Sequence, residues 1–305
     1  MSNGVQPGSY AAVPTPLTPA GDVDESALAH VLEHILTGGC RGVLVLGSSG
    51  EVAALSPESR RTVMETTISV VGDRASTLVG VASPSLNGAI ADLAVAQQFP
   101  IDAVVVTPPY YGPADQATVA RFYRELSDTT DVPLLGYHIP AFTGVRLEVE
   151  TVRELAHDGV LAGVKDSNRD LEYFQQIAAI GAATDHPWSA LVGTDSLLLP
   201  AIMAGGAGGI TLAASVAPSW TAGLFAAAAA RDFEEASRLQ GMLTSLVLAL
   251  RRGSFPAGAK AALHHLGLSG PTLAAPAVGL TDTAIADLGD LLDDLGVPRT
   301  GSGLL

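Results

Sequence analysis

The sequence predicts an α/β fold, a (β/α)8 TIM barrel with a C-terminal helical appendix. Short apolar runs rich in β-branched residues alternate with longer helix-like segments, and eight such pairs follow one another. The runs are apolar throughout, which is typical of parallel strands covered by helices. The length of 305 residues suits one large barrel as well as two ordinary domains. An open, doubly wound sheet is the structural alternative.

The eight expected strands are short and apolar, and each precedes a helix-like segment. They are Tyr10–Pro14, Gly42–Leu46, Thr77–Val81, Ala103–Thr107, Pro133–Tyr137, Ala162–Lys165, Ala190–Gly193 and Gly209–Leu212.

The expected barrel helices follow these strands, and Ser56 with Pro57 forms a typical helix start. They are Glu25–Thr37, Pro57–Val71, Asn87–Gln97, Gln116–Thr130, Glu148–His157, Leu171–Ala179, Ser196–Met203 and Pro218–Ala229. Three further helices are expected at Asp232–Arg251, Ala257–Leu266 and Asp282–Leu295. We therefore expect a barrel over residues 1–230 and a helical segment packed on it over residues 231–305.

Composition narrows the function classes. The 31 acidic residues exceed the 16 basic ones and give a net charge of −15, which disfavours a nucleic-acid binder. The one cysteine, Cys40, excludes an intramolecular disulfide framework and a cysteine-based metal cluster. No signal peptide is readable in Met1–Tyr10, and the apolar stretches are shorter than the roughly 20 residues of a membrane span. We expect a cytoplasmic protein that does not enter a membrane.

Only two residues are lysines, against 14 arginines. Lys165 ends an apolar strand, and chemistry in a (β/α)8 barrel is found at the C-terminal strand ends. Burial favours the free amine, which can attack a ketone to form a Schiff base, whereas arginine cannot. The structural alternative is a lysine paired with Asp166 or with another carboxylate at the barrel rim. We expect no catalytic role for Lys260, in an alanine-rich helix.

Other strand ends carry polar groups. Tyr137 could relay protons if its phenol faces the mouth, and otherwise would be a core tyrosine. The turn Gly47-Ser48-Ser49-Gly50 suits a carboxylate or phosphate. His30 and His34 have helical ligand spacing but no third ligand, which favours a solvated helix face over a metal site. The glycine-rich run 205–209 could approach a phosphate, as barrels often bind one near strands 7 and 8, but close backbone packing at the strand start is favoured.

Three ordered motifs together resemble the dihydrodipicolinate synthase / N-acetylneuraminate lyase family of Schiff-base pyruvate lyases. They are Gly47-Ser48-Ser49-Gly50-Glu51, Tyr137-His138-Ile139-Pro140 and Gly163-Val164-Lys165-Asp166-Ser167. The resemblance extends to Thr107-Pro108-Pro109-Tyr110-Tyr111, Gly193-Thr194-Asp195 and Gly205-Gly206-Ala207-Gly208-Gly209-Ile210, and so covers essentially the whole chain.

This resemblance implies a role for each matching residue. Lys165 would form the imine with pyruvate or a 2-oxo acid, Tyr137 would shuttle protons, and Ser48 and Ser49 would hold the pyruvyl carboxylate. Tyr111 would reach across a subunit interface, which implies a homotetramer or a homodimer. The backbone near Ile210 would line the imine, and no metal or organic cofactor is expected.

Departures from the family patterns bear on the substrate. Phe142 stands where dihydrodipicolinate synthases usually carry an arginine for the aspartate-semialdehyde carboxylate, and a phenyl ring cannot pair with a carboxylate. Asp195-Ser196 replaces the Asp-Glu pair of the acetylneuraminate lyases, which disfavours sialic acid as the substrate, and the resemblance implies that Asp195 binds substrate. Ser167 matches a Thr or Ser that aldolase members use on substrate hydroxyls. His138 replaces the common Asn.

We therefore expect a pyruvate-dependent class I aldolase, a carbon-carbon lyase acting reversibly on a 4-hydroxy-2-oxo acid. A 2-keto-3-deoxy sugar acid and 4-hydroxy-2-oxoglutarate are both candidate substrates, with pyruvate and an aldehyde as products. The alternatives are dihydrodipicolinate synthase, disfavoured by Phe142, a dehydratase of the same family, and a non-catalytic binding or sensor barrel.

Overall fold

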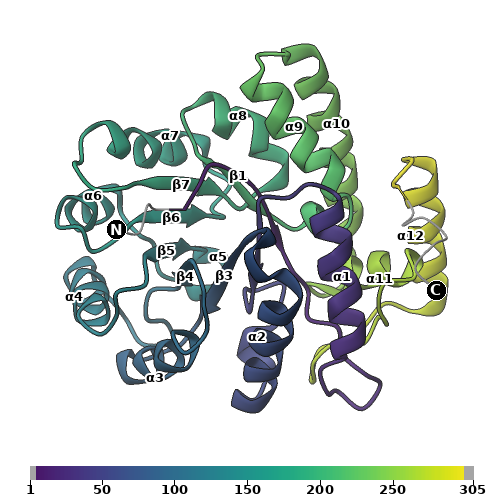
Figure 1. The fold of residues 1–305 in the computed structure, drawn as a ribbon, viewed down its shortest axis with the longest axis horizontal. Coiled ribbons are helices and arrows are strands. Elements are labelled where there is room, and N and C mark those ends of the chain that lie inside the picture. The colour runs from purple at the N-terminus through teal and green to yellow at the C-terminus, as the bar shows by residue number, and fades with distance from the viewer. Residues whose placement is uncertain (1–4, 299–305) are drawn as a thin grey trace.

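Eight parallel strands close into a barrel in the computed structural model, which describes residues 5–298 (Figure 1). The strands are β1 Gly8–Ala12, β2 Gly42–Val45, β3 Ser76–Val81, β4 Ala103–Val106, β5 Leu134–His138, β6 Gly163–Asp166, β7 Ser189–Val192 and β8 Gly208–Thr211. Because β8 pairs with β1 as well as with β7, the sheet has no open edge. The predicted (β/α)8 barrel is confirmed, and the open-sheet alternative is wrong.

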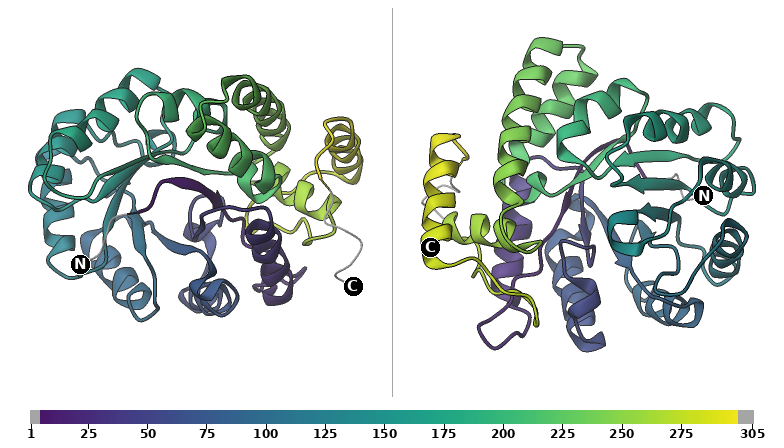
Figure 2. Two further views of the ribbon diagram at one scale, coloured as in Figure 1. Left: turned by 45° about the horizontal axis from the view of Figure 1, so that its top comes forward. Right: turned by 180° about the vertical axis from the view of Figure 1, so that it is seen from behind.

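Helices surround the strands on the outside of the barrel (Figure 2). They are α1 Glu25–Thr37, α2 Pro57–Val71, α3 Leu86–Ala96, α4 Gln116–Ser127, α6 Val149–His157, α7 Leu171–Ala179, α8 Leu198–Met203 and α9 Pro218–Ala229. The predicted start of α2 is confirmed, since the Ser56 side chain accepts a hydrogen bond from the Ser59 amide at 3.0 Å. The short helix α5, Pro140–Thr143, follows β5 and was not predicted.

Two apolar clusters form the core, one outside the barrel wall and one inside it. The larger one lies between the strands and the helices and includes Leu28, Val43 and Val164. The smaller one includes Leu44, Leu135 and other side chains that alternate with outward-facing neighbours along the strands. The alternation places every second residue of a strand inside the barrel, which decides which polar groups meet at its mouth.

The glycine-rich run before β8 packs closely against the first strand. Gly208 has a φ of +128°, and a side chain there would overlap the Gly8 carbonyl. Only glycine combines this backbone conformation with so close an approach. The expectation of close backbone packing is confirmed at Gly206, Gly208 and Gly209 but not at Gly205, where a side chain would meet open space.

Three helices follow the barrel: α10 Phe233–Leu250, α11 Ala257–His265 and α12 Asp282–Asp294. Helix α10 lies beside α9, and α12 lies at the outer edge of the molecule (Figures 1 and 2). Among residues 5–298, no helix has the length and the apolar character needed to span a bilayer.

A buried ion pair joins α11 to the loop after β2. Lys260 pairs with Glu51, and its Nζ donates to the Thr272 carbonyl at 2.7 Å. Glu51 also accepts a hydrogen bond from the Ala274 amide at 2.8 Å. These contacts fasten the segment after α11 to the barrel and give Lys260 a structural role.

Candidate active site

A cavity of about 300 Å³ opens at the C-terminal ends of the strands. Its lining includes seven of the eight residues predicted for the site: Ser48, Ser49, Tyr137, Lys165, Ser167, Asp195 and Ile210. They come from strands or loops after β2, β5, β6, β7 and β8, and only the closed barrel brings these together.

The pairing of β5 with β6 places Tyr137 beside Lys165. The two residues are partners in the strand register, so their side chains leave the sheet on the same inward face. The Lys165 Nζ lies 4.3 Å from the centroid of the Tyr137 ring. Within the described chain, this amine makes no hydrogen bond or ion pair, although Lys165 is only 3% exposed. The Lys165 amine is therefore buried and available to react with the carbonyl carbon of a ligand.

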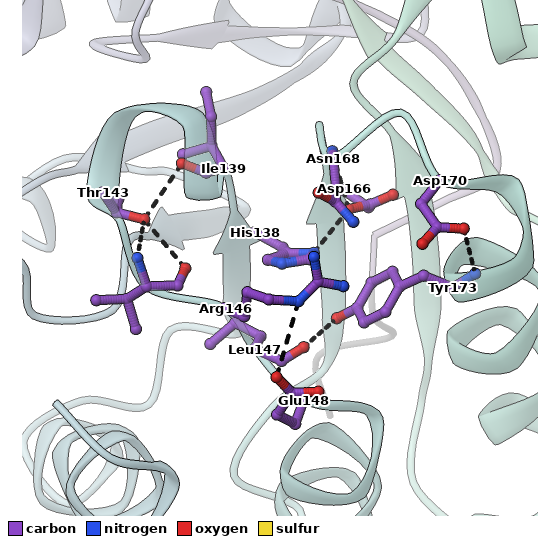
Figure 3. Close-up of polar contacts among 11 residues, drawn as sticks. His138, Ile139, Thr143, Arg146, Leu147, Glu148, Asp166, Asn168, Asp170 and Tyr173 are labelled. Carbon is purple, nitrogen blue, oxygen red and sulfur yellow. Dashed lines mark hydrogen bonds and ion pairs between the residues drawn. The ribbon is translucent and has the colours of Figure 1, made fainter.

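The next residue of each strand points outward, toward the helices (Figure 3). His138 Nδ1 lies 2.8 Å from Asp166 Oδ1, and the same oxygen accepts from the Asn168 amide at 3.2 Å. The Tyr173 ring packs against His138, with centroids 4.5 Å apart. Asp166 thus contacts His138 rather than Lys165, and the alternative of a Lys165–Asp166 pair is wrong.

Tyr173 completes an outward network with His138, Asp166 and Asn168. Its hydroxyl donates to the Leu147 carbonyl at 2.7 Å, and burial raises its pKa well above the ordinary tyrosine range (Figure 3). The phenol therefore remains a neutral donor. The outward network ties β5 and β6 to α7 and the loop before α6, directly behind Tyr137 and Lys165.

The serine turn after β2 reaches the same cavity. Ser48 Oγ lies 3.3 Å from the Tyr137 hydroxyl. Thr15 Oγ1, in the loop after β1, donates to the Gly50 carbonyl at 2.8 Å and holds the serine turn against that loop. Leu46 and Glu51, on either side of the turn, both have a φ of +56°. Left-handed backbone at non-glycine residues costs roughly 1–3 kcal/mol each and is concentrated at functional sites.

The opposite wall is formed by the loops after β6 and β7. A side chain at Gly193 would overlap Ser167 Oγ and come within 3.2 Å of Lys165 Cε, so glycine is needed for the lysine to pass. Asp195 Oδ1 accepts from the Ala213 amide at 2.7 Å. Burial raises the pKa of Asp195, and this hydrogen bond opposes the shift.

Tyr111 is the predicted site residue that lies apart from the cavity. Its side chain is 99% exposed, and its φ is +80°. The structure therefore does not bring Tyr111 to Lys165 within one chain.

Aromatic side chains line the edge of the cavity. Phe142, in α5, is 58% exposed and packs edge-to-face on Phe255 with ring centroids 5.7 Å apart. Both rings also line a neighbouring cavity of about 360 Å³ formed largely by alanine, valine and proline side chains.

Several lining residues were not singled out from the sequence. Arg169 follows Ser167 by two positions, so its place on the β6 loop was a readable signal. Arg251 and Phe255 also line the cavity, but they come from the C-terminal helical segment, and no strand-end rule points to them.

The histidine pair on α1 and the rest of residues 5–298 offer no group of His, Cys, Asp and Glu suited to a metal ion. His34 is half-buried rather than solvated, since its Nε2 lies 3.1 Å from the Val216 carbonyl, and burial lowers its pKa. The expected solvated face thus holds for His30 but not for His34.

Comparisons with known proteins agree with this geometry. The sequence model of the Dihydrodipicolinate synthetase family matches residues 6–295. An "Uncharacterized DapA-like lyase" of Halobacterium salinarum is 37% identical over 296 residues, which are 95% of each chain. A 4-hydroxy-tetrahydrodipicolinate synthase of Anaeromyxobacter dehalogenans is 31% identical over 95% of this chain and 97% of its own.

Solved structures show the same fold. YagE of Escherichia coli K12, a prophage protein of the dihydrodipicolinic acid synthase family in complex with pyruvate, has a TM-score of 0.91 and 26% identity, covering 96% of this chain and 99% of its own. A chloride-inhibited dihydrodipicolinate synthase of Acinetobacter baumannii, also with pyruvate, has a TM-score of 0.90 and 27% identity, covering 96% of this chain and 100% of its own. The chain is a lyase and belongs to the dihydrodipicolinate synthetase family.

Proposed function

We propose that this lyase is a class I pyruvate aldolase that reversibly cleaves a 4-hydroxy-2-oxo acid through a Schiff base on Lys165. The observation that carries the proposal is the buried amine of Lys165, which has no hydrogen-bond or ion-pair partner in residues 5–298 and lies beside Tyr137 in a cavity at the barrel mouth. The pyruvate complexes of structural neighbours support pyruvate as one of the ligands.

The chemistry begins with attack of the Lys165 amine on C2 of the 2-oxo acid, and loss of water leaves a protonated imine. Tyr137 supplies the proton that lets this water leave, and the resulting phenolate then takes the proton of the C4 hydroxyl, directly or through water. As the C3–C4 bond breaks, its electron pair moves toward the imine nitrogen and the aldehyde leaves. The enamine that remains is protonated at C3, and water hydrolyses the imine to release pyruvate and the free amine.

Each neighbouring residue has a place in this scheme. Ser48 and Ser49 offer hydroxyls and turn amides to the pyruvyl carboxylate, and Ser48 Oγ also lies 3.3 Å from the Tyr137 hydroxyl. Ser167 and Asp195 line the other wall, where the hydroxyl groups of the acceptor half would lie. The backbone near Ile210 lines the imine.

Dihydrodipicolinate synthase activity is the second candidate, because a relative named 4-hydroxy-tetrahydrodipicolinate synthase is 31% identical to this chain. Phe142 argues against it, since this ring lies at the cavity edge on Phe255 and offers no donor to a carboxylate. A dehydratase would use the same imine but would retain the C3–C4 bond, so its products distinguish it.

Borohydride reduction with pyruvate, followed by intact mass and peptide mapping, tests the proposal. We expect one reduced pyruvyl adduct, on Lys165. Retro-aldol assays with 4-hydroxy-2-oxoglutarate and a 2-keto-3-deoxy sugar acid should then release pyruvate and aldehyde, whereas pyruvate with aspartate semialdehyde should turn over poorly. Folded protein without an adduct would contradict the mechanism and favour a binding barrel.

We propose in addition that Tyr111 completes the proton relay in a second copy of the chain, within a homodimer or homotetramer. A bulky aromatic residue with 99% exposure and a left-handed backbone supports a contact outside the single chain. Light scattering should give a mass two or four times that of the chain. A monomer with full activity would contradict this.

A further inference from the structure

Two arginines at the Lys165 cavity have no part in the steps above. Arg169 lies in the loop after β6, and Arg251 follows the last residue of α10. Most arginines of this acidic chain form ion pairs, as Arg60 does with Asp92 at 3.0 Å. In residues 5–298, Arg169 and Arg251 form neither an ion pair nor a side-chain hydrogen bond. Their guanidinium donors are therefore available to a ligand.

A purely structural role accounts for only part of this arrangement. Arg251 caps the C-terminus of α10, where a positive charge is favourable to the helix dipole. That role needs no particular side-chain direction and does not explain a place on the cavity wall. Arg169 has a φ of +63°, a left-handed conformation that glycine or asparagine would adopt at lower cost. Strain kept at a residue that lines a catalytic cavity points to a use for its side chain.

The charges around the cavity are unbalanced. Burial has the largest effect on the pKa of Arg251 and lowers it. The positive charge of Arg169 lowers this pKa further, whereas the negative charge of Asp195 raises it. Once Lys165 becomes a protonated imine, the pyruvyl carboxylate and Asp195 oppose three cations. A substrate with a second anionic group would remove the excess of positive charge.

We propose that Arg169 and Arg251 together bind an anionic group at the far end of the acceptor aldehyde. The substrate would then be a 4-hydroxy-2-oxo acid that carries a second carboxylate or a phosphate ester. Planar guanidinium groups bind both of these anions bidentately, and together they would supply the contact that Phe142 cannot make. A cavity of about 300 Å³ limits the acceptor to a short chain. This inference rests on the proposed aldolase function and names the substrate class for it.

The competing occupant is an apolar aldehyde. The cavity of about 360 Å³ beyond Phe142 and Phe255 has an apolar lining, and an aromatic tail would lie there instead. The unpaired arginines favour the anionic acceptor, because leaving two guanidiniums unpaired beside a bound apolar group would cost free energy.

The experiment compares four acceptors in the aldol direction with pyruvate: glyoxylate, glyceraldehyde 3-phosphate, glyceraldehyde and benzaldehyde. The variants are Arg251→Gln, Arg169→Gln and, as matched control, Arg252→Gln, whose exposed side chain does not line the cavity. Steady-state kcat and KM are measured for each acceptor, and borohydride trapping with pyruvate is done on every variant.

We expect wild-type protein to prefer glyoxylate or the phosphorylated aldehyde over both neutral acceptors. Each of Arg251→Gln and Arg169→Gln should lower kcat/KM for the preferred anionic acceptor by about 10- to 100-fold, mainly through KM, as expected for a lost charged hydrogen bond. In the same two variants, kcat/KM for the neutral acceptor glyceraldehyde should change less than about threefold. Arg252→Gln should behave as wild type. The better of the two anions identifies carboxylate or phosphate as the group bound.

Two failures can be told apart. If wild-type protein traps no pyruvate, the proposed function is wrong. If it traps pyruvate but prefers benzaldehyde, or if the arginine variants lower charged and neutral acceptors equally, the aldolase stands and the anion site is wrong.

Discussion

The two lysines of the chain occupy buried sites of opposite character. Lys165, on β6, is 3% exposed, and within the described residues its amine has no hydrogen-bond or ion-pair partner. Lys260, on α11, is 1% exposed, and its amine pairs with Glu51 and donates a hydrogen bond to the Thr272 carbonyl. Burial lowers the pKa of Lys260, and Glu51 acts against that shift.

The difference shows that burial alone does not leave a lysine amine available to a ligand, because a buried carboxylate can occupy it. At Lys260 the Glu51 carboxylate forms an ion pair with the ammonium group, and this pair fastens the C-terminal segment to the barrel. At Lys165 the neighbours are an aromatic ring and a cavity, and the nearby acid Asp166 faces away toward His138. The partner of each lysine therefore separates an amine used to hold the fold from the amine that we propose to react.

Lys165→Arg should have the largest effect, because the charge remains but no amine can form an imine. We expect the rate of pyruvate release from a 4-hydroxy-2-oxo acid to fall at least about 10⁴-fold, as when other covalent nucleophiles are removed. Activity assays and intact mass after borohydride treatment measure this. Lys260→Arg is the matched control and should keep the adduct. An adduct on the Lys165→Arg protein would overturn the assignment.

Lys260→Met should affect stability rather than chemistry. The change leaves the Glu51 carboxylate buried without its cation, which typically costs about 3–5 kcal/mol of unfolding free energy. Urea unfolding measures the loss. The double variant Lys260→Met with Glu51→Gln should recover part of it, and the folded fraction should still trap pyruvate. A loss under about 1 kcal/mol would show that the pair does not fasten the segment.

Tyr137→Phe removes the hydroxyl but keeps the ring beside the Lys165 amine. We expect kcat to fall by about 10²- to 10³-fold, the usual size of acid-base catalysis, while the pyruvate adduct still forms. Single-turnover kinetics with trapping at successive times separates imine formation from carbon-carbon cleavage. Unchanged kcat would assign the proton transfers to another group.

Asp195→Asn should give the smallest effect, visible as a change in pH dependence. Unlike Glu51, Asp195 has no ion-pair partner in the described chain, and burial raises its pKa above that of an unfolded aspartate. The folded state therefore binds this proton more tightly than the unfolded state does. The resulting stabilisation is fully present below the pKa that Asp195 has in the unfolded chain, and it is lost as the pH rises through the pKa of Asp195 in the folded protein. Asparagine can still accept from the Ala213 amide.

Urea midpoints of wild type and Asp195→Asn, measured between about pH 4 and pH 7, test this difference. We expect the variant to gain stability relative to wild type as the pH rises through that window. Parallel curves for the two proteins would show that Asp195 does not titrate with a raised pKa in the folded state.

The sequence alone determined much of this protein. Strands appeared as apolar runs because a parallel sheet is buried on both faces, and helices such as α1 and α2 began and ended at the expected residues because their capping signals are local. The position of Lys165 at a strand end, with a bias against lysine elsewhere, identified the candidate nucleophile.

Other features were decided by the tertiary structure, because they depend on which face of a strand a side chain leaves and on contacts far apart in sequence. The β5–β6 register sets Tyr137 beside Lys165 and turns Asp166 toward His138. Only the packing of the C-terminal segment brings Arg251 to the β6 loop and Lys260 to Glu51, since no local pattern encodes contacts across so much intervening chain.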